Sequence, residues 1–141
     1  ISLTKSAARY VSKLSNKLRR KLDMLSSEKS LAGRRGERFI FLLAQTEDVF
    51  QKDIEEEYSI RPSTATELLK QMEAKGLIRR EPVVYDNRLK KIVLTDKALM
   101  YKQQVVEDLT SLEETLTKGI SEEDMEVFFE VIEKMMDNLS E

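Results

Sequence analysis

The chain of 141 residues contains no cysteine, no histidine and no tryptophan. Without cysteine it has no disulfide, no thiolate nucleophile and no cysteine-based redox sensor. Without histidine it lacks the commonest general base and the commonest metal ligand, and a zinc site would need carboxylates alone. The sequence also has no phosphate-binding loop and no nucleophile elbow. We therefore expect no cofactor, no metal and no enzymatic activity.

Glycine, proline and long apolar runs are also scarce. Only four glycines and two prolines interrupt the chain, so long helices are expected. No apolar run approaches the roughly 20 residues that span a bilayer, and the basic first segment is unlike a secretory signal. We expect a cytoplasmic protein without a membrane partner.

Charge is abundant and strongly segregated, although the net charge is only −2. Lys and Arg outnumber Asp and Glu by eleven to three in residues 1–38 and by eight to four in residues 61–91. Acids dominate by six to one in residues 39–60 and by thirteen to four in residues 92–141. The local sign of the charge, and not its sum, therefore bears on the choice of partner.

The spacing of apolar residues predicts a mainly α protein with one small β-ribbon. About six helices are expected: residues 3–25, a helix after Gly33, residues 50–58, residues 62–75, a helix from Thr95 to Gly119, and residues 122–139. Strands are expected at Leu77-Ile78 and Ile92-Val93-Leu94, joined by a loop of about ten residues. The predicted class is an α+β winged helix-turn-helix.

The middle of the chain has the order of a helix-turn-helix unit. A short helix, a tight connection at residues 59–62 and a helix begun by Pro62 follow one another. The inner face of the second helix is expected to hold Ala65, Leu68, Leu69 and Met72. Its outward face supplies candidate DNA contacts, which are Ser63, Thr64, Thr66, Glu67 and Lys70. An ordinary amphipathic surface helix is the alternative.

A basic β-ribbon follows this unit. The expected loop, residues 83–91, holds Arg88, Lys90 and Lys91 near its tip, and Arg79 and Arg80 lie on the leading strand. A flexible basic tip beside a recognition helix can reach the minor groove, whose negative potential attracts arginine. A solvated charge run is the alternative, but the two features in succession favour DNA binding.

Several motifs in this region, in order, resemble the MarR family of bacterial regulators. They are Gln51-Lys52-Asp53-Ile54, the run from Thr66 to Arg80, Asp86-Asn87-Arg88 and Val93-Leu94-Thr95. The resemblance covers about residues 31–98 by motif and the flanking helices by architecture. It implies a homodimer with interdigitated terminal helices that binds a pseudo-palindromic operator. It also implies that Arg88 enters the minor groove with Asp86 holding it, and that a small-molecule effector binds beside the DNA-binding module. No ligand residues are assigned.

One residue departs from the family pattern. Many members carry a basic residue where this chain has Glu67. A carboxylate there would repel phosphate, unless it accepts a hydrogen bond from a cytosine amino group. The sequence leaves its role open.

The two ends of the chain are expected to form the dimer. The basic first helix and the acidic last fifty residues both carry narrow apolar stripes, which a second copy could cover. The candidate dimer residues are Val11, Leu14, Leu18, Leu112, Leu116, Phe128, Ile132 and Met135. An intramolecular bundle is the alternative. The expected division is a dimerisation helix in residues 1–32, the DNA-binding module in 33–95 and dimerisation helices in 96–141.

Arginines near the start of the second helix are candidate phosphate contacts. They are Arg34, Arg35 and Arg38, and plain surface charge is their alternative explanation. The function expected from all these features is a sequence-specific regulator of transcription that binds double-stranded DNA as a homodimer, a repressor released by an effector. An architectural or protein-interaction module without effector control is the alternative.

Overall fold

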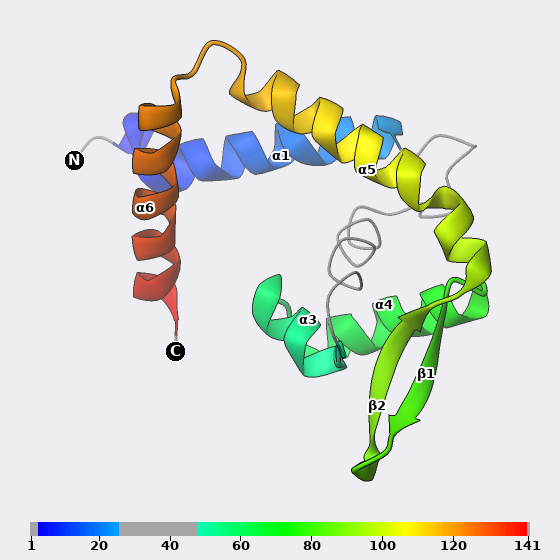
Figure 1. Cartoon of the computed structure of the whole chain (residues 1–141). Helices are drawn as coiled ribbons and strands as arrows, with labels where there is room; N and C mark the ends of the chain where they lie inside the picture. Colours follow the sequence, from blue (N-terminus) through cyan, green and yellow to red (C-terminus); the bar gives the residue numbers. More distant parts are fainter. Residues whose placement is uncertain (1–2, 26–47, 141) are drawn as a thin grey trace. The chain divides into compact units, whose positions relative to one another are not determined.

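The computed structural model describes residues 3–25 and 48–140, which are mostly helical with one two-stranded sheet (Figure 1). The predicted fold class, mainly α with a small β-ribbon, is confirmed. The chain divides into two compact units, residues 1–108 and 109–141. No helix of the described ranges is both long and apolar enough to cross a membrane. The helix predicted after Gly33 falls outside these ranges.

The first helix begins later than its apolar pattern predicted. A single 3-10 turn, η1 (Leu3–Lys5), precedes α1 (Ala7–Leu25). The hydroxyl of Ser6 accepts a 3.2 Å hydrogen bond from the main-chain N–H of Arg9. Because a serine in this role stands outside the helix that it caps, the predicted start at Leu3 is wrong by four residues.

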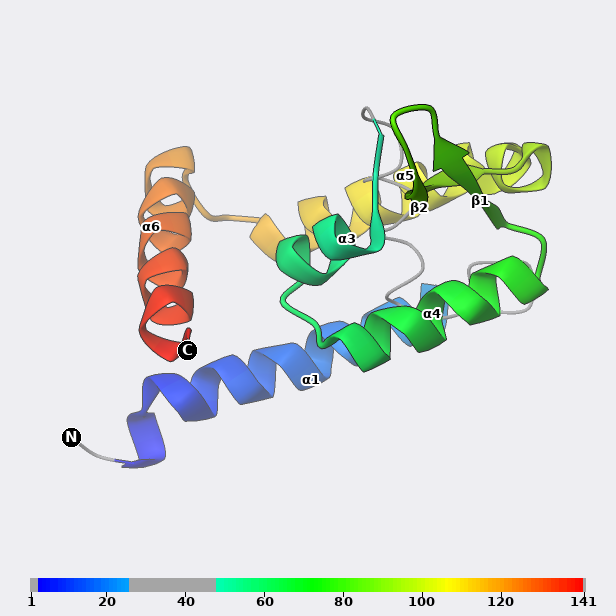
Figure 2. The ribbon, with the colours of Figure 1, turned by 90° about the horizontal axis from the view of Figure 1, so that it is seen from below.

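Two short helices, α3 (Gln51–Glu57) and α4 (Pro62–Ala74), form the helix-turn-helix unit (Figure 2). The carboxylate of Asp53 accepts a 2.9 Å bond from the main-chain N–H of Phe50 and so closes the first turn of α3. Ile54 is fully buried. Ser59 has a φ of +51°, an uncommon left-handed conformation for a residue other than glycine, and it ends α3.

The inner face of α4 is largely the predicted one. Ala65, Leu69 and Met72 are completely buried, whereas Leu68 is only half-buried. The helix is terminated two residues after Ala74 by Gly76, whose φ of +74° lies in the left-handed region. The N–H of Leu77 then donates to the carbonyl of Met72 at 2.9 Å, a Schellman closure that satisfies the last turn of α4.

The β-hairpin consists of β1 (Ile78–Val83) and β2 (Asp86–Leu94), paired antiparallel. The register runs from Ile78 opposite Leu94 to Pro82 opposite Lys90. Only residues 84 and 85 separate the strands, so the predicted ten-residue loop is wrong. Charged residues and a proline are tolerated in these strands because each strand of a two-stranded ribbon has a free edge.

The hairpin is irregular close to its turn. The register shifts between Pro82, which faces Lys90, and Val83, which faces Asp86. Residues 87–89 of β2 therefore have no partner in this register, and they form a bulge. Arg88 lies in this bulge, while Lys90 and Lys91 belong to the regular part of β2. The expectation that all three lie in a flexible loop is therefore corrected.

The hairpin joins the rest of the unit through its base. The N–H of Ile92 donates to the carbonyl of Val49 at 2.7 Å, on the edge of β2 away from β1. Helix α5 (Asp96–Thr117) follows directly, and Thr95 caps it as predicted, because its hydroxyl accepts a 3.2 Å bond from the N–H of Ala98. The buried side chains Leu77, Ile78 and Ile92 lie at this base.

The second unit contains the end of α5 and helix α6 (Glu122–Leu139). Ser121 caps α6 by accepting a 3.1 Å bond from the N–H of Asp124. The first turn contains three acidic side chains, whose negative charges interact favourably with the positive end of the helix dipole. No residue of α6 is buried in the single chain.

Candidate nucleic-acid interface

The first half of α4 offers a small, polar and exposed surface. Ser63, Thr64, Glu67 and Lys70 are exposed, and Thr66 is half-buried. They lie outward because Ala65, Leu69 and Met72 take the opposite face into the core. Short side chains at a helix start let the backbone approach phosphates and base edges closely.

Glu67 is held by its own helix. The side-chain amide of Gln71 donates to Glu67 Oε1 at 3.3 Å, one turn further along α4. Within the described ranges Glu67 has no ion-pair partner. The carboxylate therefore keeps acceptor capacity on the exposed face of the helix.

Asp86 and Arg88 form a tightly connected pair in the hairpin, which we call the wing (residues 78–94). Asp86 Oδ1 accepts bonds from the main-chain N–H of Arg88 at 2.9 Å and from its Nε at 3.2 Å. Asp86 Oδ2 accepts a third bond from an Arg88 terminal nitrogen at 3.3 Å. The side-chain and main-chain bonds from Arg88, in that order, lower the pKa of the Asp86 carboxyl below its usual value.

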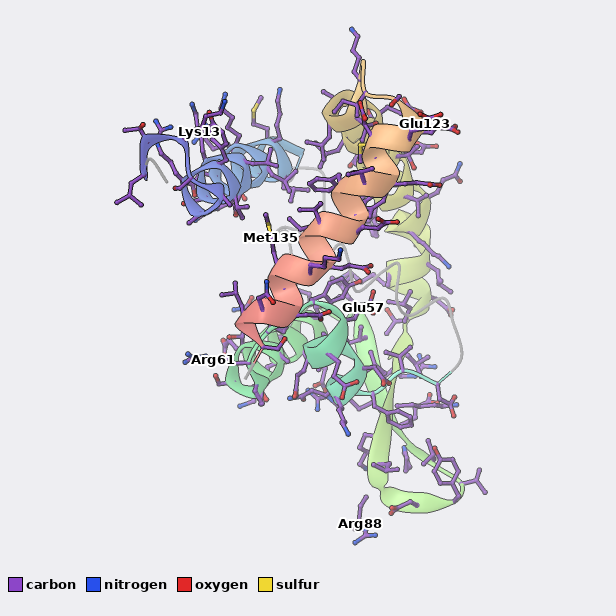
Figure 3. All side chains as sticks on the ribbon, turned by 90° about the vertical axis from the view of Figure 1, so that its left-hand side faces the viewer. Lys13, Glu57, Arg61, Arg88, Glu123 and Met135 are labelled. Atoms are coloured by element: carbon purple, nitrogen blue, oxygen red, sulfur yellow. The ribbon has the colours of Figure 1, made fainter. Side chains whose placement is uncertain are left out.

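The Arg88 guanidinium nonetheless remains open to a partner. Its side chain is 90% exposed, whereas that of Asp86 is 27% exposed. The arginine projects outward from the turn end of the wing (Figure 3). Asp86 thus restricts the conformations of the arginine and leaves most of its donor surface accessible to solvent.

Other basic residues near the wing already have acidic partners. Lys91 lies 3.7 Å from Asp48, and Arg79 lies 3.0 Å from Glu81. Arg80 Nε lies 2.9 Å from Glu73, an ion pair whose N–H does not point at the carboxylate. Lys90 is exposed. The positive charge most accessible in the wing is therefore that of Arg88 and Lys90.

Sequence reasoning missed one residue of this surface. Gln51, the first residue of α3, donates from its side-chain amide to the hydroxyl of Thr66 at 2.9 Å. The sequence shows a glutamine four residues before Glu55, which indicates only a pair within α3. The link across the turn to α4 has no signal in the sequence.

Several predicted site residues belong to other helices or fall outside the described residues. Arg34, Arg35 and Arg38 fall outside the described residues. Among the predicted dimer residues, four are 41–45% exposed in the single chain: Val11, Leu14, Leu116 and Phe128. Leu18, Leu112, Ile132 and Met135 are half-buried. In the described ranges no group of three acidic side chains could hold a metal ion.

Comparison with known proteins supports the resemblance seen in the sequence. The model of the MarR family matches residues 38–90. The HTH-type transcriptional regulator YdgJ of Bacillus subtilis strain 168 is 24% identical over 99 residues, which are 70% of this chain. The match spans 60% of that relative's length.

Solved structures extend the match over nearly the whole fold. The transcription regulator MarR of Oenococcus oeni PSU-1 has a TM-score of 0.84 at 27% identity, covering 94% of this chain and 99% of that one. The MepR–DNA complex of S. aureus has a TM-score of 0.80 at 24% identity, covering 95% and 98%. The family match includes the helix-turn-helix and most of the wing, and this part of the chain is similar to the MarR family of winged helix-turn-helix transcription regulators.

Proposed function

We propose that this chain binds double-stranded DNA in a sequence-specific way and regulates transcription, as a homodimeric repressor. The observation that carries the proposal is the pairing of two exposed surfaces in one module. These are the polar start of α4 and a wing whose Arg88 is held by Asp86 and is 90% exposed. The solved MepR relative is a DNA complex, which supports the same partner here.

In the proposed complex, α4 enters the major groove and the wing reaches the adjacent minor groove. Ser63 and Thr64 donate to phosphates, and Lys70 and Lys90 add positive charge. Further candidate contacts to DNA are Lys91, Arg34 and Arg35. Arg88 enters the minor groove, where negative potential favours a guanidinium. Asp86 contributes by restricting Arg88 before DNA is bound, so that less conformational entropy is lost on binding.

The terminal helices and the geometry of DNA support the proposed homodimer. Residues 1–32 and 96–141 are proposed as dimerisation segments around the DNA-binding module of residues 33–95. Half-exposed apolar residues on α1 and α6, such as Leu14 and Phe128, would be covered by a second copy. Two recognition helices about 34 Å apart could then enter successive major grooves of a pseudo-palindromic operator.

Repression and effector release are proposed from the similarity to MarR-family regulators. The spacing of the two recognition helices must match that of the major grooves for the operator to bind. A small molecule that binds more tightly to a dimer with mismatched spacing would therefore release the operator. A repressor of this kind works where the DNA is, which supports a cytoplasmic location. A regulator of this type has no need of catalysis, and we propose no enzymatic activity.

The test is selection of bound duplexes from a random-sequence library, followed by titration at several salt concentrations. The proposal expects one enriched inverted repeat and an affinity for it that falls steeply with salt, because phosphate contacts release counterions. Enrichment without a sequence preference would favour an architectural DNA protein instead. No retained DNA, or an affinity insensitive to salt, would contradict DNA binding altogether.

A further inference from the structure

The side-chain amide of Gln51 lies at the junction between the two helices of the helix-turn-helix unit. Its Nε2 is 2.9 Å from the hydroxyl of Thr66, 3.1 Å from Glu55 Oε2 and 3.3 Å from the carbonyl of Pro62. Glu55 belongs to the same helix, α3, whereas Pro62 and Thr66 belong to α4. One half-buried side chain therefore connects the start of α3 to the first turns of α4.

The chemistry of the partners fixes the orientation of this amide. A carboxylate and a peptide carbonyl only accept hydrogen bonds, so the NH₂ group and not the oxygen of Gln51 must face them. Two N–H groups serve three acceptors, and the shortest contact is the one to Thr66. The Thr66 hydroxyl is thus an acceptor toward Gln51, and its own proton stays available for donation to another acceptor.

The location of the bond explains why it matters for α4. The connection between the helices contains Ser59 at a φ of +51°. Ile54 on α3 and Leu69 on α4 are fully buried, and apolar burial is not directional, so it does not by itself fix the rotation of the exposed face of α4. Hydrogen bonds are directional, so the Gln51 contacts can fix that rotation.

We propose that Gln51 is a positioning residue for DNA recognition, which sets the start of α4 and presents the Thr66 hydroxyl as a donor to a base-edge acceptor. This inference rests on the proposed function, since it names how the same surface is held. Gln51 itself needs no contact with DNA. It acts on the specificity of binding through the geometry of α4.

The first test compares Gln51→Met with Gln104→Met. Gln104 is a matched control, because it also donates to an acid four residues on, Asp108 at 2.9 Å, but has no bond to α4. Both proteins are titrated with the duplex that the wild type selects from a random library and with a scrambled duplex of equal length. Gln51→Met should weaken binding to the selected duplex by about two- to tenfold, as for one lost hydrogen bond.

Binding of the scrambled duplex should be unchanged for both variants, because nonspecific affinity depends on charge. A general structural defect would lower the affinities for both duplexes and would also lower the midpoint of thermal unfolding. Equal losses on the two duplexes, or the same loss in Gln104→Met, would overturn the positioning role.

A double-mutant cycle isolates the pair. If Gln51 acts through Thr66, then Thr66→Val should remove most of the effect of Gln51→Met on the selected duplex. Additive losses would mean that the two side chains act independently, contrary to the proposal.

A measurement without DNA separates this inference from the proposed function. The N–H of Ala65 donates to the carbonyl of Arg61 at 3.0 Å in the first turn of α4, and its hydrogen exchange reports the order of that turn. Gln51→Met should speed this exchange severalfold, and Gln104→Met should leave it unchanged. Unchanged exchange in Gln51→Met would overturn the positioning role even if DNA binds. Failure of the wild type to select any duplex would overturn the proposed function and the role of Gln51 in it, whereas the exchange rates would still show whether Gln51 orders the start of α4.

Discussion

The ammonium group of Lys97, in the first turn of α5, donates a 2.7 Å hydrogen bond to the main-chain carbonyl of Lys75 at the end of α4. The stem of the same lysine lies over Gly76, where an added Cβ would be 3.7 Å from Lys97 Cδ. Thr95 adds two bonds, from its hydroxyl to the Gly76 carbonyl at 2.5 Å and from its N–H to the Leu77 carbonyl at 3.0 Å. The end of α4 is thereby fixed to the start of α5.

Replacing this lysine tests the strength of the connection. Lys97→Met keeps an unbranched stem over Gly76 but removes a positive charge from the negative end of the α4 dipole. We expect the free energy of unfolding to fall by about 0.5–1.5 kcal/mol, the range for a helix-terminal charge and one hydrogen bond. Urea titration measures it. The control is Lys102→Met on the same helix, because within the described structure the side chain of Lys102 makes no hydrogen bond or ion pair. Equal losses in both variants would contradict a specific role for Lys97.

Features with a local cause were predictable from the sequence. Pro62 begins α4, Gly76 ends it with a φ of +74°, and Thr95 caps α5, each for a reason contained within a few neighbouring residues. The buried face of α4 followed from helical periodicity. Such signals depend on backbone geometry and burial near the residue itself, so one sequence is enough to read them.

Features that depend on distant partners were not predictable. The strands of the wing extend to Val83 and Asp86 because Glu81, Pro82 and Val83 find the cross-strand partners Lys91, Lys90 and Asp86, although the segment Asp86–Lys91 is too polar to read as a strand. The Gln51–Thr66 bond likewise joins residues on two helices whose relative rotation the sequence does not encode locally. Pairing register and side-chain contacts between elements arise only when the chain is folded.

Removing the arginine of the wing should weaken operator binding without disturbing the fold. Arg88→Ala is expected to cost about 1–3 kcal/mol in binding the selected duplex, the range for a groove-reading arginine. Asp86→Asn should cost less, because the guanidinium remains but is held less firmly. Fluorescence anisotropy at one fixed salt concentration measures both, and Arg79→Ala is the matched control on the same wing. Equal affinity of Arg88→Ala and wild type would contradict a minor-groove role.

Glu67 should determine which base is preferred at one position of each half-site. An exposed carboxylate in the major groove accepts a hydrogen bond from the cytosine amino group, whereas glutamine prefers adenine. Duplexes selected by Glu67→Gln should therefore differ from those of the wild type at one position in each half-site, with adenine replacing cytosine. Glu56→Gln, on the exposed side of α3, serves as the control and should select the wild-type sequence. Identical selections by Glu67→Gln and wild type would leave Glu67 without a role in specificity.

Tyr58 should make stability fall at alkaline pH. Burial, with a smaller contribution from the neighbouring Glu57 charge, raises the pKa of its phenol from 10.0 to about 12. The folded state therefore holds this proton more tightly than the unfolded state. Its contribution to stability is complete below the unfolded pKa of 10.0 and is lost as the pH rises toward about 12. Urea midpoints measured across that window should fall less steeply for Tyr58→Phe, and parallel curves would argue against the raised pKa.

The apolar face of α6 should be essential for the dimer. Ile132 is half-buried and Phe128 is 42% exposed in the single chain, so a second copy would remove apolar surface from water on this face. Sedimentation of the wild type at micromolar concentration should give twice the mass of one chain. Ile132→Asp would place an unpaired charge in that interface, which is expensive, so it should shift the protein toward single chains and weaken binding to an inverted repeat. Glu130→Gln, exposed on the same helix, should leave the mass unchanged. A wild type that sediments as a single chain would instead support an intramolecular bundle. In that case Ile132→Asp would change the free energy of unfolding but not the sedimenting mass.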